Sequence, residues 1–222
     1  MRAESMTIAI DDEVEARTAI CNLADLLHGL GNIAPRRVRM CPPLGTATVT
    51  DIVRNKSCEL IDGVLVEKAM GQRESQLSSF LVYLLNGFVL PQNLGIVYGP
   101  DATLEILTGL VRLPDVAFIS WSTLPGRTAP KEPVPNIVPD LAVEVIREGD
   151  TPSEMARKRA DYFTAGVRLV WMIDRFKLTA SVYTAVDQFH TLTIDDALDG
   201  EDVLPGFSLK LTALFGELDR QG

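Results

Sequence analysis

The sequence predicts an α/β protein in which helices flank a mixed β-sheet, and three observations carry this prediction. First, the apolar run LAVEVI (141–146) precedes a helix expected over about 152–165, and the apolar run VRLVWMID (167–174) follows it. A strand, a crossover helix and a second strand usually place the two strands parallel. Second, Asp62-Gly63 joins two apolar runs, which is typical of an antiparallel hairpin. Third, residues 72–89 carry apolar side chains at helical spacing.

The segment before the hairpin predicts helix and loop. Residues 11–30 have apolar residues at roughly helical spacing and end in glycines. A stretch rich in Pro and Arg follows over 35–45, and residues 48–55 could form a short helix. We therefore divide the chain into an N-terminal helical extension and loop (1–57) and a main domain (58–222).

The main domain continues with short elements. The helix over 72–89 is expected to close at Pro91 and Asn93. A Pro-rich loop is expected over 125–139, and Thr151, Pro152 and Glu154 favour the start of the next helix, which Gly166 ends. Three β-rich runs precede the loop: GIVYG (95–99), ATLEIL (102–107) and DVAFIS (115–120). Two edge strands are expected after VRLVWMID, over 177–186 and 189–194. The tail over 204–218 suggests a short last helix.

Composition excludes several classes of protein. With 46% hydrophobic residues the chain is not disordered, and its apolar runs are far shorter than the ~20 residues of a membrane-spanning helix. The acidic start has no signal-peptide core, so a cytoplasmic protein is expected. Three cysteines without a CxxC motif predict reduced thiols, and two distant histidines disfavour a histidine metal site or a Ser-His-Asp triad.

The net charge of −9 argues at first against nucleic acid, because a basic surface is the usual sign of phosphate binding. The charge is uneven, however. Residues 1–30 carry a net −4, residues 187–222 a net −6, and residues 31–186 a net +1. The acidity therefore belongs to the ends and does not exclude DNA. It predicts that any DNA surface is local, near Arg147 and the basic run 157–159.

Two carboxylates lie where polar groups are scarce. Asp115 opens the apolar run DVAFIS, and Glu144 lies inside LAVEVI. A buried carboxylate is costly unless it is paired or binds a cation. Either acid could instead be bridged to an arginine or face solvent at a strand end. Two acids on strands of one sheet can also converge on a single Mg²⁺ or Mn²⁺.

Three further residues could join this pair. Lys158 and Tyr162 are four residues apart and share a helix face that can fold back over the sheet. A cationic amine beside paired carboxylates suits phosphodiester hydrolysis. Lys158 could equally lie on a solvated helix face. Glu74 lies in the first turn of its helix, where the helix dipole alone favours an acid.

These residues stand in a pattern that resembles a known family. PDVAF, PDLAVEV and then K-x-x-x-Y-x-x-x-G-V-R-L-V-W-x-x-D, together with CELIDGVLVEK and LPGF, resemble the Uma family of putative restriction endonucleases over about residues 58–215. That family belongs to the PD-(D/E)XK nuclease superfamily, so the resemblance implies a restriction-endonuclease-like core. It also implies that Glu74, Asp115, Glu144 and Lys158 are catalytic.

The resemblance further implies that Asp115 and Glu144 bind the metal, with the backbone carbonyl of Val145 as a candidate third ligand. The chain departs from the motif at Ile146, which stands where the motif lysine is usual. The lysine would then have moved to Lys158 on the next helix. The turn at 147–152 is more charged than the Ser-Pro-Ser type of turn common in the family, and Met172 is a further departure.

The resulting hypothesis is a Mg²⁺- or Mn²⁺-dependent DNA endonuclease that acts as a homodimer, since two-fold symmetry matches the two DNA strands. An alternative is a nuclease fold without activity that binds nucleic acid or protein, which the altered turn at 147–152 favours. A third hypothesis is a structural, oligomer-forming protein, suggested by the acidic ends.

Overall fold

The structure is a computed structural model that describes residues 22–68, 71–219 and 221. Its helices, including three short 3₁₀ turns (η), and its strands are, in chain order, α1 (Leu23–Gly29), η1 (Pro35–Arg37), α2 (Val49–Arg54), β1 (Cys58–Ile61), β2 (Val64–Glu67), α3 (Gln72–Gln92), β3 (Gly95–Tyr98), β4 (Leu104–Leu107), β5 (Leu110–Arg112), β6 (Val116–Ser120), η2 (Pro125–Arg127), β7 (Leu141–Val145), α4 (Pro152–Ala165), β8 (Leu169–Asp174), β9 (Thr179–Ala185), β10 (Gln188–Leu192), β11 (Ala197–Gly200), β12 (Leu204–Lys210), α5 (Leu211–Gly216) and η3 (Glu217–Asp219).

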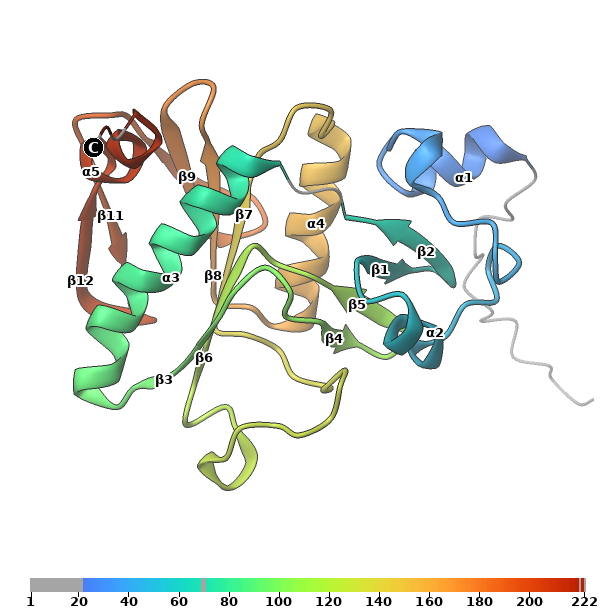
Figure 1. Cartoon of the computed structure of the whole chain (residues 1–222), viewed down its shortest axis with the longest axis horizontal. Coiled ribbons are helices and arrows are strands. Elements are labelled where there is room, and N and C mark those ends of the chain that lie inside the picture. The colour runs from blue at the N-terminus through green and yellow to red at the C-terminus, as the bar shows by residue number, and fades with distance from the viewer. Residues whose placement is uncertain (1–21, 69–70, 220, 222) are drawn as a thin grey trace, which may run out of the picture.

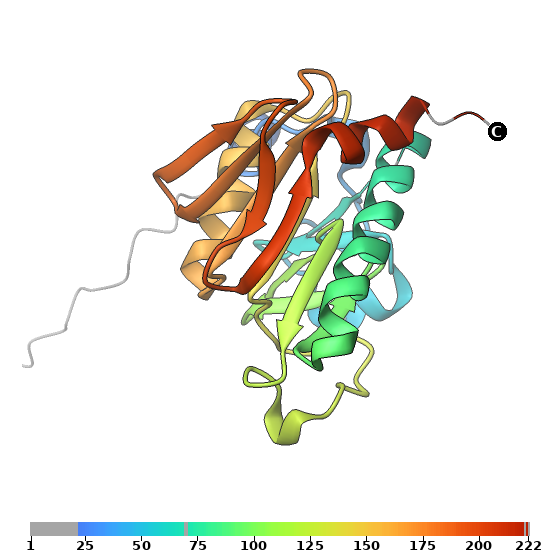
Figure 2. The same cartoon turned by 90° about the vertical axis from the view of Figure 1, so that its left-hand side faces the viewer.

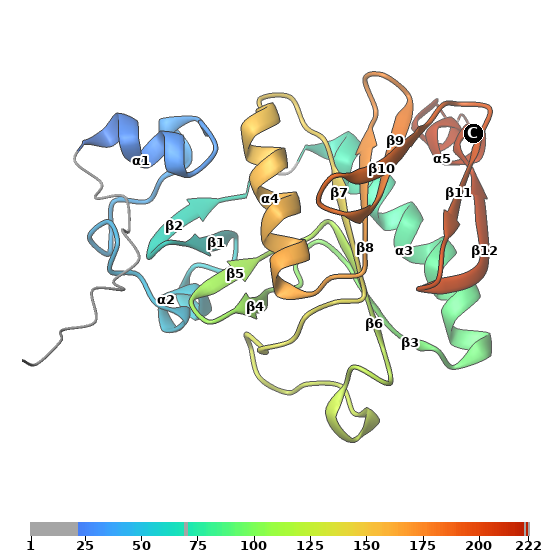
Figure 3. The same cartoon turned by 180° about the vertical axis from the view of Figure 1, so that it is seen from behind.

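The centre of the molecule is a six-stranded mixed sheet in the order β10-β9-β8-β7-β6-β3. Strands β7 and β8 are parallel and joined through α4, while every other neighbouring pair is antiparallel. Helix α3 covers one face of this sheet and α4 covers the other, as opposite views show (Figures 1 and 3). The mixed α/β fold predicted from the sequence is therefore confirmed.

Each face of the sheet has its own apolar core. On the α3 side, Leu77, Leu81 and Leu85 pack in one cluster with Val143 and Trp171. Helix α5 and the hairpin β11–β12 close the same core, and Figure 2 shows them beside α3. On the α4 side, a second cluster includes Met155 and Tyr162 of α4. Because β7 is buried on both faces, any polar side chain that it carries must find its partners inside the protein.

The predicted hairpin forms, but it belongs to a second sheet. Strands β1 and β2 pair antiparallel around Asp62 and Gly63, whose φ angles of 50° and 71° suit a tight hairpin turn. They continue into a four-stranded sheet in the order β2-β1-β5-β4. The sequence pattern did not predict β5, because three residues are too few to show a period. Nor could it predict which sheet the hairpin joins.

Other boundaries differ in detail. Helix α3 continues through Pro91, which has no N–H to donate to the carbonyl four residues earlier, and ends one residue later at Gln92. Asn93 then adopts the left-handed conformation at the C-terminal cap, as the sequence predicted. Of the two strands predicted to lie at an edge, β10 does so, whereas β9 lies inside the central sheet between β10 and β8. The hairpin β11–β12 was not predicted, whereas the helix expected in the tail is confirmed as α5.

The described part of the N-terminal extension packs closely on the main domain. Helix α1 is the end of the helix expected over 11–30; residues 11–21, with Cys21, lie outside the described residues. The helix expected over 48–55 is confirmed as α2, whose Ile52 shares an apolar cluster with Leu60. Cys41 and Cys58 are free thiols, as expected. The division at residue 58 stays a prediction.

Mean hydropathy along the described helices stays below that of a membrane-spanning segment of sufficient length. Among them, none combines the length and the apolar character that a bilayer crossing requires.

Gly31 packs the extension against the start of α4. Its φ is +89°, and a Cβ atom there would lie 2.6 Å from the Cα of Glu154. Its carbonyl accepts a hydrogen bond of 2.5 Å from the Thr151 hydroxyl at the start of α4. Any side chain at position 31 must therefore push α4 and the preceding loop apart.

We expect Gly31→Ala to lower the free energy of unfolding by about 2 kcal/mol or more, because it combines backbone strain with a backbone clash. Urea denaturation measures this. Gly29→Ala is the matched control, because no atom lies within 4 Å of a Cβ there. Equal stability of the two variants would contradict the tight packing of the extension on α4.

Candidate active site

Asp115 lies beside the middle of the central sheet, directly before β6, and is 1% exposed. Its backbone N–H donates to the carbonyl of Val143 at 2.8 Å, and its Oδ2 accepts from the backbone N–H of Val145 at 2.6 Å. These two contacts bracket Glu144 on the neighbouring strand. The prediction that two acids on two strands come together is therefore consistent with the fold.

Glu144 is buried within β7, with 2% exposure, and its two oxygens have different partners. Lys158 Nζ donates to Oε2 at 3.0 Å, and the Tyr162 hydroxyl donates to Oε1 at 2.6 Å. Both partners come from one face of α4, as their four-residue spacing predicted. Lys158 itself is 1% exposed, which excludes a solvated helix face.

The charges around Glu144 set its protonation chemistry. Burial raises the pKa of Glu144 above its usual range; the charges of Asp115 and Glu59 add to this, and those of Lys158 and Lys68 oppose it. The pKa of Lys158 is raised: burial by itself lowers it, but the charges of Glu144 and Glu59 prevail. The Lys158 side chain is thus an ammonium ion at neutral pH. Burial and the Glu144 charge raise the pKa of Tyr162, which keeps its hydroxyl a donor.

Sequence reasoning missed a third buried carboxylate, Glu59 of β1. Its Oε1 lies 3.4 Å from Lys158 Nζ, and its Oε2 accepts from Arg112 at 2.8 Å. Arg112 also bonds Asp161 of α4. Burial alone would raise the pKa of Glu59, but Lys158, Arg112 and Lys68 hold it well below its usual range. A signal was available, because Glu59 interrupts an apolar strand in the same way as Glu144 does.

Lys68 is the second residue that sequence reasoning missed. It follows β2, is 8% exposed, and places its Nζ 2.7 Å from Asp115 Oδ1. It also donates to the backbone carbonyl of Leu113. Each of the two central carboxylates therefore has its own lysine. A lysine at the end of a strand is ordinarily exposed, so the sequence offered no signal for it.

Glu74 is buried in the first turn of α3, but it pairs with Arg175 at 2.5 Å instead of joining the central acids. It lines a groove of about 560 Å³ together with Arg147, whose charge acts on both Glu144 and Asp115. The structure thus brings Asp115, Glu144 and Lys158 together and places Glu74 at the wall of the adjoining groove.

The basic run 157–159, near which a DNA surface was expected, contacts other parts of the protein. Arg157 pairs with Asp62 at 2.7 Å and reaches the carbonyl of Gly29, Lys158 is buried, and the Arg159 guanidinium lies 4.7 Å from the ring centre of Tyr183. A DNA surface at this run stays a prediction.

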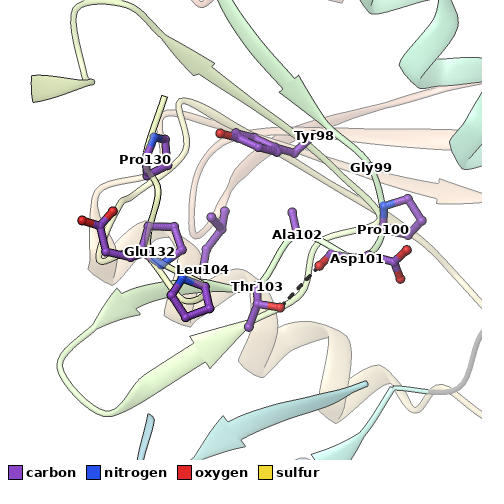
Figure 4. Close-up of a pocket in the computed structure, with 11 residues that line it drawn as sticks. Tyr98, Gly99, Pro100, Asp101, Ala102, Thr103, Leu104, Pro130 and Glu132 are labelled. Carbon is purple, nitrogen blue, oxygen red and sulfur yellow. Dashed lines mark hydrogen bonds between the residues drawn. The ribbon is translucent and has the colours of Figure 1, made fainter. Parts of the chain in front are cut away.

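A second pocket, of about 430 Å³, lies away from the acids (Figure 4). Tyr98, Leu104 and several prolines form its walls, and Asp101 and Glu132 add negative charge. Its lining includes none of the predicted catalytic residues.

The donor set can be tested against a divalent ion. No group of three or more His, Cys, Asp or Glu side chains arranged for a metal occurs among residues 22–68 and 71–219. Mg²⁺, however, commonly takes one or two carboxylates and completes its shell with water and substrate phosphate. Asp115 Oδ1 fits this role, because it is buried and, among the described residues, its one polar partner is the ammonium of Lys68. The residues therefore fit a magnesium or manganese ion.

Comparisons with known proteins bear on the family and the fold of the chain. A family model described as "Uma2: Putative restriction endonuclease" matches residues 22–212. Among solved structures, a putative nuclease belonging to DUF820 from Anabaena variabilis is similar with a TM-score of 0.66 at 20% identity, over 74% of this chain and 92% of that chain. At this identity the likeness shows the fold. No curated protein matches the sequence.

Proposed function

The chain belongs to the Uma2 family of putative restriction endonucleases, and from this premise we propose that it is a divalent-metal-dependent nuclease that hydrolyses phosphodiester bonds in DNA. One observation carries the proposal: Asp115 and Glu144 lie side by side on adjoining strands, with the ammonium of Lys158 3.0 Å from Glu144. Two acids and one amine in this arrangement are what phosphodiester hydrolysis requires.

The roles follow from the contacts. Asp115 and Glu144 would hold the ion through their carboxylate oxygens, with the Val145 carbonyl as a further candidate. When bound, Mg²⁺ or Mn²⁺ polarises the phosphate and lowers the pKa of a coordinated water. Lys158 stays charged and stabilises the negative charge that builds on the phosphate. Tyr162 fixes the orientation of the Glu144 carboxylate.

Two more groups support this site without contacting the acids directly. Glu59 pairs with the ammonium of Lys158 at 3.4 Å, and Arg112 in turn pairs with Glu59 at 2.8 Å. Glu74 anchors Arg175 at the groove wall, so a positioning role suits it better than the direct assisting role implied by the family resemblance. The homodimer and the cytoplasmic location stay predictions.

A second function is favoured by a specific observation. Asp115 and Glu144 are 1% and 2% exposed, and each is neutralised by a lysine. A protein with this closed arrangement could bind nucleic acid without cleaving it. The two functions differ in whether substrate and ion can displace Lys68 from Asp115 and Lys158 from Glu144.

The deciding experiment uses the purified full-length chain. We expect supercoiled plasmid to be nicked and linearised with Mg²⁺ or Mn²⁺ and to stay intact with EDTA. Gel electrophoresis measures the products, and calorimetric titration with Mn²⁺ measures the ion. Binding of DNA with no cleavage and no Mn²⁺ binding would instead support the binding function.

A further inference from the structure

The groove next to the acid pair has an excess of positive charge. Five arginines line it: Arg36, Arg37, Arg73, Arg147 and Arg175. Three carboxylates face them: Glu74, Glu148 and Asp150. Two of the arginines are neutralised by carboxylates of the lining, because Arg175 pairs with Glu74 and Arg147 pairs with Asp150. Arg37 is held by Glu154, outside the groove lining.

The remaining cations lie at the rim. Arg36 is exposed and has no ion pair within the described chain. Among the described residues, Arg73 reaches the Leu218 carbonyl at 3.5 Å and the exposed Asp219 at 3.8 Å. Within the groove lining, the carboxylate not yet paired is that of Glu148, which is exposed and free to turn away. The rim therefore attracts anions.

Arg147 supplies an unused donor at the inner wall. Its Nε and Nη2 bond the carboxylate of Asp150, at 3.2 and 2.8 Å. Its side chain is 8% exposed, yet Nη1 has no acceptor among the described residues. A buried donor without an acceptor is costly, so such atoms usually have a ligand or water as partner.

The start of α3 opens onto the same groove. Gly71 is the N-terminal cap of this 21-residue helix, and no side chain caps its first turn. Gly71, Gln72 and Arg73 all line the groove. A helix N-terminus of this kind favours anions through its free N–H groups and its dipole. The Glu74 carboxylate lies back against Gly71, and its pairing with Arg175 limits its competition with a bound anion.

We propose that this groove binds a phosphate of the DNA backbone next to the phosphate that is cleaved, with Arg147 at its inner wall and Arg36 and Arg73 at its rim. The inference rests on the proposed function for the cleaved phosphate. Arg147 lies two residues after Val145, whose backbone N–H donates to Asp115 at 2.6 Å, so the groove and the acid pair adjoin. A phosphate in the groove would then fix the register of the strand across the site, as backbone contacts generally do.

Binding is tested without cleavage. A fluorescent 20-base-pair duplex is titrated in EDTA at several salt concentrations with wild type, Arg36→Gln, Arg73→Gln and the double variant. Both side chains are exposed, so the fold is unaffected. We expect each single variant to bind about 5- to 10-fold more weakly near 0.1 M salt and to lower the slope of log K against log salt by about one. The matched control is Arg54→Gln, exposed on α2 away from the groove, with an expected change below about twofold.

A second measurement identifies the phosphate. Duplexes with one neutral methylphosphonate linkage, scanned along the strand, should include a position that weakens wild type but has no further effect on the double variant. The proposal would be overturned if Arg54→Gln lost as much affinity as the rim variants, or if the salt slopes were unchanged. It would also be overturned if the neutral linkage weakened the double variant as much as wild type, or if wild type did not bind DNA.

The plasmid assay keeps the two proposals apart. Cleavage by wild type together with unchanged binding by the double variant refutes the groove and leaves the nuclease standing. Loss of binding in the double variant, with no cleavage by wild type under any divalent ion, supports the groove and refutes the nuclease.

Discussion

Glu144→Gln is expected to lower divalent-dependent DNA cleavage by about 10³-fold or more. Glutamine keeps the shape of the side chain, and its amide oxygen still accepts from Tyr162, whose hydroxyl lies 2.6 Å from Glu144 Oε1. The substitution removes the negative charge that would hold the ion and that pairs with Lys158. A catalytic metal is worth several kcal/mol of transition-state stabilisation, and each 1.4 kcal/mol is a factor of ten in rate.

The stability of this variant separates catalysis from folding. Burial disfavours the charged form of Glu144, so its removal relieves part of that penalty, and Lys158 keeps Glu59 as a partner at 3.4 Å. We therefore expect folding to survive, as measured by circular dichroism and urea denaturation. Glu132→Gln, on the exposed loop before β7, is the control with the same change of atoms. Full cleavage by Glu144→Gln, or an equal loss of cleavage in Glu132→Gln, would contradict a catalytic role for Glu144.

The pairing of Glu144 with Lys158 could be predicted because it depends on local rules. A strand followed by a helix folds back over the sheet, and residues four apart on that helix face the same way. The end of LAVEVI and the first turns of α4 therefore meet in almost any packing of this unit. Asp115 could be added because an acid at the start of an apolar strand is costly without a partner.

The partner of Glu74 could not be predicted from local rules of this kind. Its position in the first turn of α3 followed from the sequence, but its partner Arg175 lies 101 residues later, after β8. Only the packing of α3 against the end of that strand brings the two together. The same holds for the hairpin β1–β2, whose pattern predicts two strands but does not say that they leave the central sheet to build another.

Glu59 and Arg112 are further charged residues of short apolar strands, as Glu144 is, and both are 1% exposed. The argument that made Glu144 a candidate applies equally to Glu59. Their partnership with Lys158 was not visible in the sequence, because it joins the second sheet to α4 of the central one. The site is thus assembled at the contact between two sheets.

Arg112→Met is expected to lower the free energy of unfolding by about 3–5 kcal/mol, the range for breaking a buried ion pair by removing one partner. Arg112 Nη1 lies 2.8 Å from Glu59 Oε2, and both side chains are 1% exposed. Methionine fills much of the volume but leaves Glu59 with one close cation fewer. Urea denaturation of the variant and of wild type measures the loss.

Two further variants decide whether the burial of the pair causes this loss. Arg39→Met removes an ion pair with Glu67 in which the arginine is 52% exposed, so it should cost less than about 1 kcal/mol. The double variant Arg112→Met with Glu59→Met replaces both charges by apolar groups, and we expect it to recover much of the stability lost by Arg112→Met alone. If the double variant were no more stable than Arg112→Met alone, the penalty would come from packing and not from the stranded charge of Glu59. In that case Arg112 would act as a spacer between the second sheet and α4, and Lys158 would keep its position without it.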